Sequence, residues 1–457
     1  MKTYAIVLAA GKGTRMKSNR PKVVHEVLYK PMIVHIVEQL KQLEIDEIFV
    51  VVGYQADQVK AVIDGVTFVY QNEQLGTGHA IMQAKELLAD KEGTTLILNG
   101  DAPLIRHETL NKLRKFHNEN KFKGTIMTCD CDLETRFGRI IKDGNQVTGI
   151  VEYRDATEAQ RNIAEMNVGE YCFDNIELFK ALEKIDSNND QNEYYLTDVV
   201  KIMNDDQIKV GSYKIPDLME VGGINNLYEL AEATKAMQRR VNKELLLEGV
   251  QIIDPENTYI SNDVSIGAHT LVEPGCIIRG KTTIGENCHI GPNCEIANTT
   301  IGDNVEIKFS VIHDSTIENN VDMGPYVRLR NNCHILEGVH MGNFVEMKNA
   351  TFGAGSKAAH LSYIGDAKVG KNVNIGCGTI TVNYDGKNKS VTTIEDNAFI
   401  GCNANLVAPL VIGKGAFVAA GSTVTKDVGP DDFAIARSKE VIKTGYAKTL
   451  EEKRNKK

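Results

Sequence analysis

A six-residue repeat fills most of the second half of this chain. A large apolar residue recurs at every sixth position, and a small residue follows it four positions later. This spacing keeps both residues facing inward if each hexad makes one short strand and a corner, and three hexads close a triangular coil. The repeat therefore predicts a parallel β-helix of about ten coils, stacked at the ~4.8 Å spacing of β-strands. The large residues are Ile260, Ile266, Val272, Ile278, Ile284, Ile290 and Ile296, then Ile394, Ile400, Leu406, Ile412, Val418 and Val424; the small ones are Val264, Thr270, Cys276, Thr282, Cys288, Cys294 and Thr300.

The repeat also accounts for four of the nine cysteines. Cys276, Cys288, Cys294 and Cys333 take the small inward position, so we expect them in the core. No two cysteines form a CxxC pair, and we therefore predict no structural zinc. A disulfide between the stacked Cys276 and Cys294 is not expected in a reducing compartment.

Two segments depart from the hexads. The register blurs over residues 352–363, and a polar excursion, NYDGKNKS, leaves the coil at residues 383–390. Function is most often placed where a regular solenoid is interrupted, so both segments are candidates for a site.

The first half of the chain has a different pattern. Short apolar runs, among them residues 47–53 and 95–101, alternate with helical patterns for about 220 residues. This alternation predicts an α/β fold with a mostly parallel sheet and ligands at the carboxyl ends of its strands. Apolar residues at helical spacing then predict one bridging helix. The predicted domains are residues 1–226, the helix at 227–247 and the β-helix at 248–457.

A glycine-rich turn follows the first apolar run. Residues 8–16 read LAAGKGTRM, and Pro21-Lys22 comes shortly after. Such a turn lets backbone N–H groups approach a triphosphate, while Arg15 and Lys22 can neutralise its charge. The third glycine of GxGxxG is missing and there is no GxxxxGK[ST], so two common phosphate loops do not fit. The motif indicates nucleotide chemistry; the alternative is an ordinary strand-to-helix turn with solvated basic residues.

The net negative charge limits the kinds of binding partner that the protein can have. A charge of −9 and a pI near 5.8 argue against nucleic acid or an anionic membrane as the main partner. The N-terminus lacks the layout of a signal peptide, and no segment approaches ~18 uninterrupted apolar residues. We expect a soluble cytoplasmic protein without membrane insertion.

Six motifs, in order, closely resemble the bacterial bifunctional N-acetylglucosamine-1-phosphate uridylyltransferase/glucosamine-1-phosphate N-acetyltransferase family. They are LAAGKGTRM (8–16), EQLGTGHA (73–80), GIVEYRDAT (149–157), NEYYLTD (192–198), EGVHMGNFVEMKNA (337–350) and GCGTITVNYDG (376–386). The resemblance covers essentially the whole length. It implies a Rossmann-like nucleotidyltransferase domain, a left-handed β-helix and a homotrimer with acetyltransferase sites between subunits. The product would be UDP-N-acetylglucosamine, a precursor for cell-wall peptidoglycan.

The resemblance assigns residues to a uridylyltransferase site. Asp101, a hard oxygen ligand in NGD at a strand end, suits Mg²⁺, and the family pattern pairs it with Asn225 as the metal ligands. Arg15 and Lys22 would stabilise charge on the phosphates during the reaction with UTP. The uridine nucleotide would contact Leu8, Ala9, Ala10, Gly11, Lys22, Gln71, Gly76 and Thr77, and the sugar would contact Gly100, Gly138, Glu152 and Asn167.

The same matching assigns an acetyltransferase site in the β-helix. Acetyl transfer needs a neutral amine, so a general base is useful, and His360 matches the catalytic histidine of the family. The sugar phosphate would bind Arg330, Lys348, Tyr363 and Asn374; acetyl-CoA would bind Cys377, Asn383, Tyr384, Cys402, Ala420 and Arg437. An acyl-enzyme on Cys377 or Cys402 is the less favoured mechanism.

Two other functions remain open from the sequence. One is a single-activity sugar-phosphate nucleotidyltransferase whose β-helix is structural or regulatory. The other is a non-enzymatic scaffold or exchange-factor subunit built on the same folds, which predicts loss of the charged site residues. His360, Tyr363 and the NYDG loop weigh against the first alternative, and Arg15, Lys22 and Asp101 weigh against the second.

Overall fold

The computed structural model describes residues 2–133, 135, 137–144, 146–189 and 191–455. It contains two compact units, Met1–Met237 and Gln238–Lys457. The domain borders predicted at residues 226 and 247 remain predictions. No helix among the described residues is long and apolar enough to cross a membrane.

The first unit is built on one nine-stranded sheet in the order β11-β7-β10-β6-β1-β4-β5, with the β8–β9 hairpin attached to β10. Its strands are β1 (Thr3–Ala9), β4 (Glu47–Val52), β5 (Thr67–Tyr70), β6 (Thr94–Asn99), β7 (Gly124–Asp130), β8 (Arg139–Asp143), β9 (Gln146–Val151), β10 (Glu165–Asp174) and β11 (Val210–Ile215). A separate ribbon pairs β2 (Glu26–Val27) with β3 (Lys30–Pro31).

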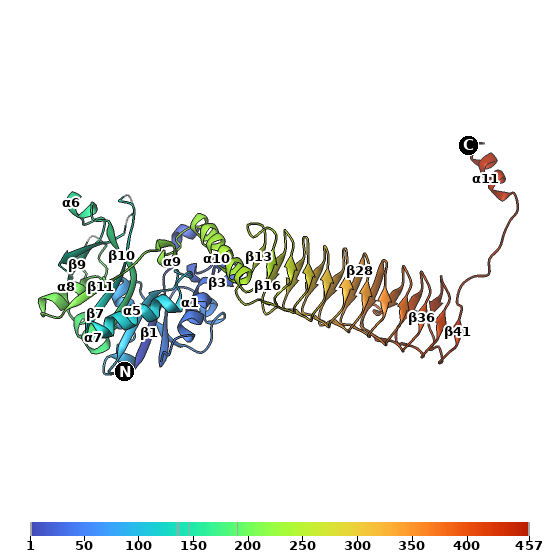
Figure 1. Cartoon of the computed structure of the whole chain (residues 1–457), viewed down its shortest axis with the longest axis horizontal. Helices are drawn as coiled ribbons and strands as arrows, with labels where there is room; N and C mark the ends of the chain where they lie inside the picture. The colour runs from blue at the N-terminus through green and yellow to red at the C-terminus, as the bar shows by residue number, and fades with distance from the viewer. Residues whose placement is uncertain (1, 134, 136, 145, 190, 456–457) are drawn as a thin grey trace. The chain divides into compact units, whose positions relative to one another are not determined.

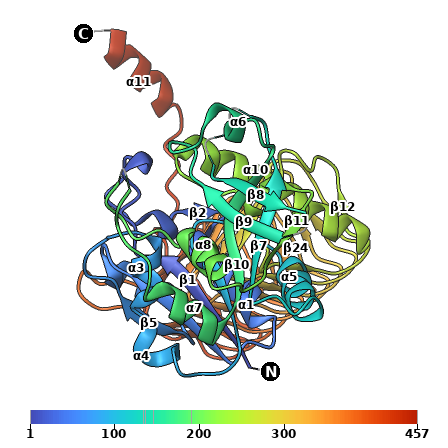
Figure 2. The ribbon, with the colours of Figure 1, turned by 90° about the vertical axis from the view of Figure 1, so that its left-hand side faces the viewer.

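Apolar side chains cover both faces of this sheet. Along β1, Tyr4 and Ile6 pack into one core, and Ala5 and Val7 pack into the other, as the two-residue period of a strand requires. Helices α3, α4, α7 and α8 contribute to the first core, and α1 and α5 to the second (Figure 2). Helix bounds are α1 (Met32–Lys41), α2 (Ala56–Lys60), α3 (Thr77–Met82), α4 (Lys85–Leu88), α5 (His107–Glu119), α6 (Glu158–Arg161), α7 (Asn175–Leu182), α8 (Asp198–Asp205), α9 (Leu218–Val221) and α10 (Leu227–Leu247).

The sheet is mostly parallel, as the sequence predicted, and β10 is the antiparallel exception in its main strand order. The strands β6, β1, β4 and β5 are parallel neighbours, but β10 lies antiparallel between β6 and β7. The β8–β9 hairpin and the short α6 connect β7 to β10, and this connection is not the helical crossover that parallel neighbours need. Parallel strands surround β1, so their carboxyl ends meet at one edge.

The second unit contains a parallel β-helix with three faces (Figure 1). Face 1 has eleven strands, from β12 (Gln251–Ile252) to β41 (Phe433–Ala434). Face 2 has ten, from β13 (Tyr259–Ile260) to β40 (Thr423–Val424), and face 3 has nine, from β14 (Ser265–Ile266) to β38 (Leu410–Ile412). The short helix α11 (Tyr446–Asn455) follows. These stacks confirm the β-helix that the hexads predicted.

One inward position was predicted wrongly. Thr300 lies outward on β20 (Thr300–Ile301) and is exposed, while Thr299 is fully buried in its place. The reason is a shorter coil: Ile284 pairs with Ile301, seventeen residues later instead of eighteen. A fixed six-residue period cannot anticipate one missing residue.

The second half of α10 closes the first coil of the β-helix. The buried side-chain amides of Gln238 and Asn242 both donate to the Thr258 carbonyl, at 2.7 and 2.9 Å. These bonds satisfy a backbone oxygen at the start of the coil, which would otherwise be costly to bury.

Candidate active sites

The glycine turn after β1 carries the first candidate site. Gly13 has φ 65°, and a Cβ there would lie 2.5 Å from Lys22 Cβ, so glycine is required on both counts. The Gly100 amide donates to the Leu8 carbonyl at 2.9 Å, and the Tyr54 amide donates to Ala10 at 3.2 Å. The ends of β1, β4 and β6 thus hold the backbone at residues 8–11, while Gly11 has open space beside it.

Four side chains from distant parts of the sequence converge beside this turn. Lys22 Nζ donates to Asp101 Oδ2 and, at 2.8 Å, to Asn225 Oδ1. Arg15 donates to the same Asn225 oxygen at 2.7 Å. Lys22 and Asp101 are largely shielded, with side-chain exposures of 13% and 21%. Two cations and two oxygen ligands therefore meet at one point, where Lys22 and Asp101 are shielded and Arg15 is exposed.

The start of α10 orients Asn225. Asn226 accepts a hydrogen bond from the Glu229 amide at 2.9 Å, while the Glu229 carboxylate accepts from the Asn225 amide and the Asn226 side chain, both at 2.6 Å. Asn226 thus caps the N-terminus of the helix, and Glu229 bonds back to the cap and to the residue before it. The cap fixes the backbone from which the Asn225 amide side chain reaches Lys22.

The oxygen pair fits a divalent cation. The Lys22 ammonium already occupies the point where the Asp101 and Asn225 oxygens converge, so the site accepts positive charge. No group of three or more His, Cys, Asp or Glu side chains among the described residues could hold a metal. Two protein oxygens, completed by water and substrate phosphates, are typical of Mg²⁺ in phosphoryl-transfer sites.

A second group of predicted residues follows β5. The buried Gln71 donates to the Gly76 carbonyl at 3.1 Å, and Thr77 Oγ1 accepts from the Leu196 amide at 3.1 Å. Gly76 has φ 108°, and a Cβ there would lie 2.6 Å from the Tyr194 carbonyl. Residues 71–77 therefore pack against the segment 192–198. This contact brings together two of the six motifs, EQLGTGHA and NEYYLTD.

Three of the four residues predicted for the sugar, Gly138, Glu152 and Asn167, lie together, whereas Gly100 packs against Leu8. The Asn167 amide donates to the Gly138 carbonyl at 2.9 Å, and a Cβ on Gly138 would come within 3.4 Å of Glu152 Oε1. Burial raises the pKa of Glu152, and the nearby charges of Asp155 and Asp198 add to this.

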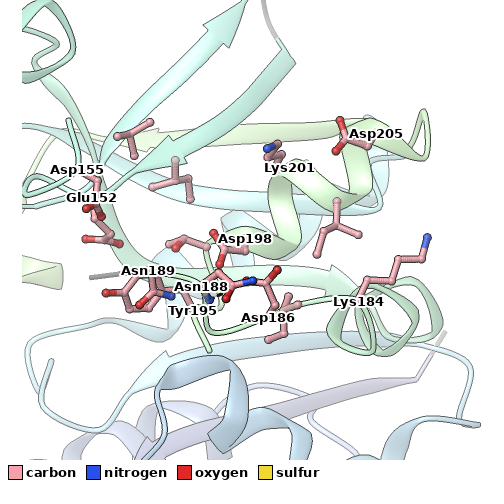
Figure 3. Close-up of a pocket in the computed structure, with 15 residues that line it drawn as sticks. Glu152, Asp155, Lys184, Asp186, Asn188, Asn189, Tyr195, Asp198, Lys201 and Asp205 are labelled. Carbon is pink, nitrogen blue, oxygen red and sulfur yellow. Dashed lines mark hydrogen bonds between the residues drawn. The ribbon is translucent and has the colours of Figure 1, made fainter. Parts of the chain in front are cut away.

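Glu152 also lines two separate cavities. One, of about 380 Å³, places it with Asp155, Tyr195 and Asp198 (Figure 3). The other, of about 570 Å³, is lined by Arg15, Glu152, Tyr153, Arg154, Arg161 and Gln191. The second of these brings a residue predicted for the phosphates and one predicted for the sugar to one cavity.

In the β-helix, His360 begins a column at the corner between faces 1 and 2. Strand pairing puts Ala358, Ile375, Ile400 and Val418 in register on successive coils. The residues two positions later, which we call the His360 column, are His360, Cys377, Cys402 and Ala420. The Asn403 amide donates to the Cys377 carbonyl at 2.7 Å and the Gly421 amide to the Cys402 carbonyl at 2.8 Å, so the corners stack directly. A Cβ on Gly421 would meet Arg437, which places Arg437 at the end of the column.

The basic residues predicted for the sugar phosphate lie along the other edge of face 2. Arg330, Lys348 and Gly365 are in register on β25 (Arg328–Arg330), β28 (Val345–Lys348) and β31 (Ser362–Gly365). Tyr363 lies over Gly365, where a Cβ would collide with its hydroxyl. Asn383 donates to Asp366 at the same edge.

Two predicted residues lie elsewhere. Asn374 is on face 1, in register with Lys357 and Phe399, and not on the face of Arg330 and Lys348. Tyr384 is exposed on the excursion and donates to the Gly386 carbonyl at 2.7 Å. The residues predicted for the sugar phosphate therefore lie on two faces of one chain, Asn374 on face 1 and Arg330 and Lys348 on face 2.

Comparison with known proteins identifies the family. Residues 4–237 match the nucleotidyl transferase model, residues 260–352 the GMPPB C-terminal domain model, and residues 392–426 the bacterial transferase hexapeptide model of six repeats. The bifunctional protein GlmU of Geobacillus sp. (strain WCH70) is 52% identical over 457 residues, which is 100% of both chains. The chain belongs to the GlmU family. The GlmU protein of Listeria monocytogenes serotype 4a (strain HCC23) is 49% identical over 98% of this chain and 99% of its own.

The solved structure of a UDP-glucose pyrophosphorylase complexed with UDP-glucose matches less closely. Its TM-score is 0.43 at 18% identity, and it covers 52% of this chain and 100% of its own. The family resemblance and the fold class inferred from the motifs, a nucleotidyltransferase domain followed by a left-handed β-helix of hexapeptide repeats, are confirmed by the GlmU relatives and the family models.

Sequence reasoning missed Lys389. This residue lies on the excursion, and its ammonium beside Lys348 lowers the pKa of Lys348. Lys389, Lys348 and Arg330 therefore gather positive charge at one edge of face 2. The basic residues of NYDGKNKS were the available signal, but their distance from Lys348 in sequence hid the contact.

Sequence reasoning also missed Glu170. Burial raises the pKa of this carboxyl well above its ordinary value, and the charge of Asp101 adds to the shift. The backbone and side chain of Asn99 lie beside it and oppose this shift in pKa, but neither carboxyl oxygen has a partner at full hydrogen-bond geometry within the described part of the chain. An acidic residue inside the buried run MNVGEYCF was the signal.

We expect Glu170→Gln to stabilise the protein increasingly as pH rises. Because the pKa of Glu170 is raised in the folded protein, the folded chain releases this proton at a higher pH than the unfolded chain, which ionises above about pH 4.5; this residue therefore costs stability as pH rises above that value. Glutamine keeps the shape without the proton linkage, and we expect a gain of about 1–3 kcal/mol at pH 8. Thermal unfolding at pH 5 and pH 8 measures it. Glu119→Gln, an exposed control, should show no such trend; an equal gain at both pH values would contradict the assignment.

Proposed function

We propose that this protein makes UDP-N-acetylglucosamine for peptidoglycan synthesis in two steps. It acetylates glucosamine-1-phosphate with acetyl-CoA, then transfers UMP from UTP to N-acetylglucosamine-1-phosphate and releases pyrophosphate. The observation that carries this proposal is 52% identity to a bifunctional GlmU protein over the whole chain. The charged residues of both predicted sites are present. Because UTP and acetyl-CoA are cytoplasmic metabolites, we assign the reaction to the cytoplasm.

In uridylyl transfer, a phosphate oxygen of the sugar substrate attacks the α-phosphate of UTP and pyrophosphate leaves. Charge grows on the phosphate oxygens, and Arg15 and Lys22 are positioned to stabilise it. Asp101 and Asn225 would hold Mg²⁺, which when bound neutralises phosphate charge and orients the triphosphate. The backbone of residues 8–11 with Gln71, Gly76 and Thr77 would hold the nucleotide; Gly100, Gly138, Glu152 and Asn167 would hold the sugar.

Removing divalent metal tests the magnesium proposal. We expect EDTA to lower pyrophosphate release by roughly 100-fold or more and to leave acetyl transfer unchanged, because only the first unit has a predicted metal pair. Adding Mg²⁺ back should restore the rate. Pyrophosphate release that survives in metal-free buffer would contradict it.

In acetyl transfer, His360 would take the proton from the sugar amine as the amine attacks the thioester carbon. Arg330 and Lys348, with Lys389 beside them, supply the charge that a phosphate dianion requires. The His360 column, with Arg437 at its end, would hold acetyl-CoA together with Asn383 and Tyr384.

We also propose a homotrimer. Asn374 lies on face 1, whereas Arg330 and Lys348 lie on face 2. A second copy that brings its face 1 to this face 2 would complete the set, which supports a site shared between subunits. Sedimentation analysis measures the assembly, and a monomer with full acetyl transfer would contradict the shared site.

Mass spectrometry of products tests the two activities together. The purified protein is incubated with glucosamine-1-phosphate, acetyl-CoA, UTP and Mg²⁺, and UDP-N-acetylglucosamine is the expected product. If product forms only from supplied N-acetylglucosamine-1-phosphate, the β-helix is structural or regulatory and the bifunctional proposal fails.

A further inference from the structure

Two of the nine cysteines stand in register in the His360 column. Ile375 pairs with Ile400, so Cys377 and Cys402 occupy the same corner position on neighbouring coils. A Cβ on Gly376 would lie 2.6 Å from the Cys402 amide nitrogen, so the two corners touch. Neighbouring strands lie about 4.8 Å apart, which is within the Cα separation that a disulfide spans.

These two thiols are also the reachable ones in the β-helix. Cys402 is exposed and Cys377 is half-buried, whereas Cys276, Cys288, Cys294 and Cys333 are buried. Of the three cysteines in the first unit, only Cys131 is comparably accessible. A small oxidant in solution therefore meets Cys377 and Cys402 before the core thiols.

His360 occupies the corner one coil before the pair. Ala358 is in register with Ile375, so His360 precedes Cys377 in the column, and the Gly378 amide donates to the neighbouring Leu361 carbonyl at 2.6 Å. A bridge at Cys377 would therefore form one coil away from the predicted base of acetyl transfer.

We propose that Cys377 and Cys402 form a thiol modification site that a low-molecular-weight disulfide converts into a cross-coil disulfide, blocking acetyl transfer. One thiolate attacks the small disulfide, forming a mixed disulfide and releasing one thiol. The second thiolate then attacks the protein sulfur of that mixed disulfide and releases the second thiol. Two protein thiols are oxidised, one small disulfide is reduced, and the two protein protons end on the released thiols.

The effect on activity rests on the proposed function, because the same column is proposed to hold acetyl-CoA next to His360. A bridge draws both sulfurs together across that surface, and a displacement of about 1 Å near a reacting group costs large factors in rate. Uridylyl transfer takes place in the other compact unit and should not change.

The full-length protein is treated with oxidised glutathione, and three quantities are measured: the Cys377–Cys402 bridge by peptide mass mapping, N-acetylglucosamine-1-phosphate formation, and pyrophosphate release. We expect the bridge to form, acetyl transfer to fall roughly 10-fold or more, and dithiothreitol to reverse both, with pyrophosphate release unchanged. Cys402→Ser should form no bridge. Cys131→Ser, the matched control, should behave as the unaltered protein.

Three results would overturn the proposal: free thiols at both positions after treatment, a bridge without loss of acetyl transfer, or inhibition that disappears in Cys131→Ser. Bridge mapping does not depend on catalysis. If the reduced protein fails to acetylate glucosamine-1-phosphate, the proposed function fails, and the bridge then decides whether the thiol site exists.

Discussion

Asp101→Ala is expected to lower uridylyl transfer by roughly 10³-fold while acetyl transfer stays within about twofold. Asp101 supplies one of the two oxygens that converge on Lys22, and its removal leaves the Lys22 ammonium with the Asn225 oxygen alone. The substitution therefore takes a proposed metal ligand and the partner of a phosphate-binding cation together. Pyrophosphate release with Mg²⁺ measures the first activity, and acetylated sugar phosphate measures the second.

Two further variants separate charge from fold. Asp101→Asn keeps the volume and an acceptor for Lys22 but removes the negative charge, so it should lose nearly as much activity while unfolding at the same temperature as the unaltered protein. Asp90→Ala removes an exposed carboxylate of the same unit and should change neither activity. Undiminished pyrophosphate release in Asp101→Ala would exclude Asp101 as a metal ligand.

The parts of the fold that repeat could be predicted from the sequence. The hexads predict the β-helix directly. Each inward apolar residue marks one strand, and the equivalent residue three hexads later marks the strand that pairs with it on the next coil. The central strands could also be predicted, because β1 and β4 are continuous apolar runs. Thr299 and β10 could not: the first depends on a coil shortened by one residue, and the second on how a hairpin connects two strands.

The contacts between distant residues could not be predicted without a family pattern. Lys22 and Asn225 meet although 203 residues separate them, and Lys348 meets Lys389 only because the excursion folds back on the coil. The His360 column is an intermediate case. Its spacing of 17, 25 and 18 residues follows from the coil lengths, but the excursion lengthens one step and hides the periodicity. For Glu170, the apolar residues around it in the sequence indicate that it is buried. The lack of a hydrogen-bond partner for its carboxyl oxygens among the described residues depends on the tertiary structure and could not be predicted.

His360→Ala is expected to lower acetyl transfer by roughly 10²–10⁴-fold, the usual contribution of a general base, and to leave uridylyl transfer unchanged. His360 is exposed at its corner, so removing its ring leaves no core cavity, and thermal unfolding should not move. Rates are measured as N-acetylglucosamine-1-phosphate formed at saturating acetyl-CoA.

The control and the split between kinetic constants make this prediction specific. His334→Ala removes a partly exposed histidine that pairs with Glu318 on face 3 of the same β-helix, and it should keep full acetyl transfer. A base acts in the reacting complex, so His360→Ala should lower kcat with little change in KM for glucosamine-1-phosphate. A raised KM at unchanged kcat would instead assign His360 to substrate binding, and the proton would then need another acceptor in the column.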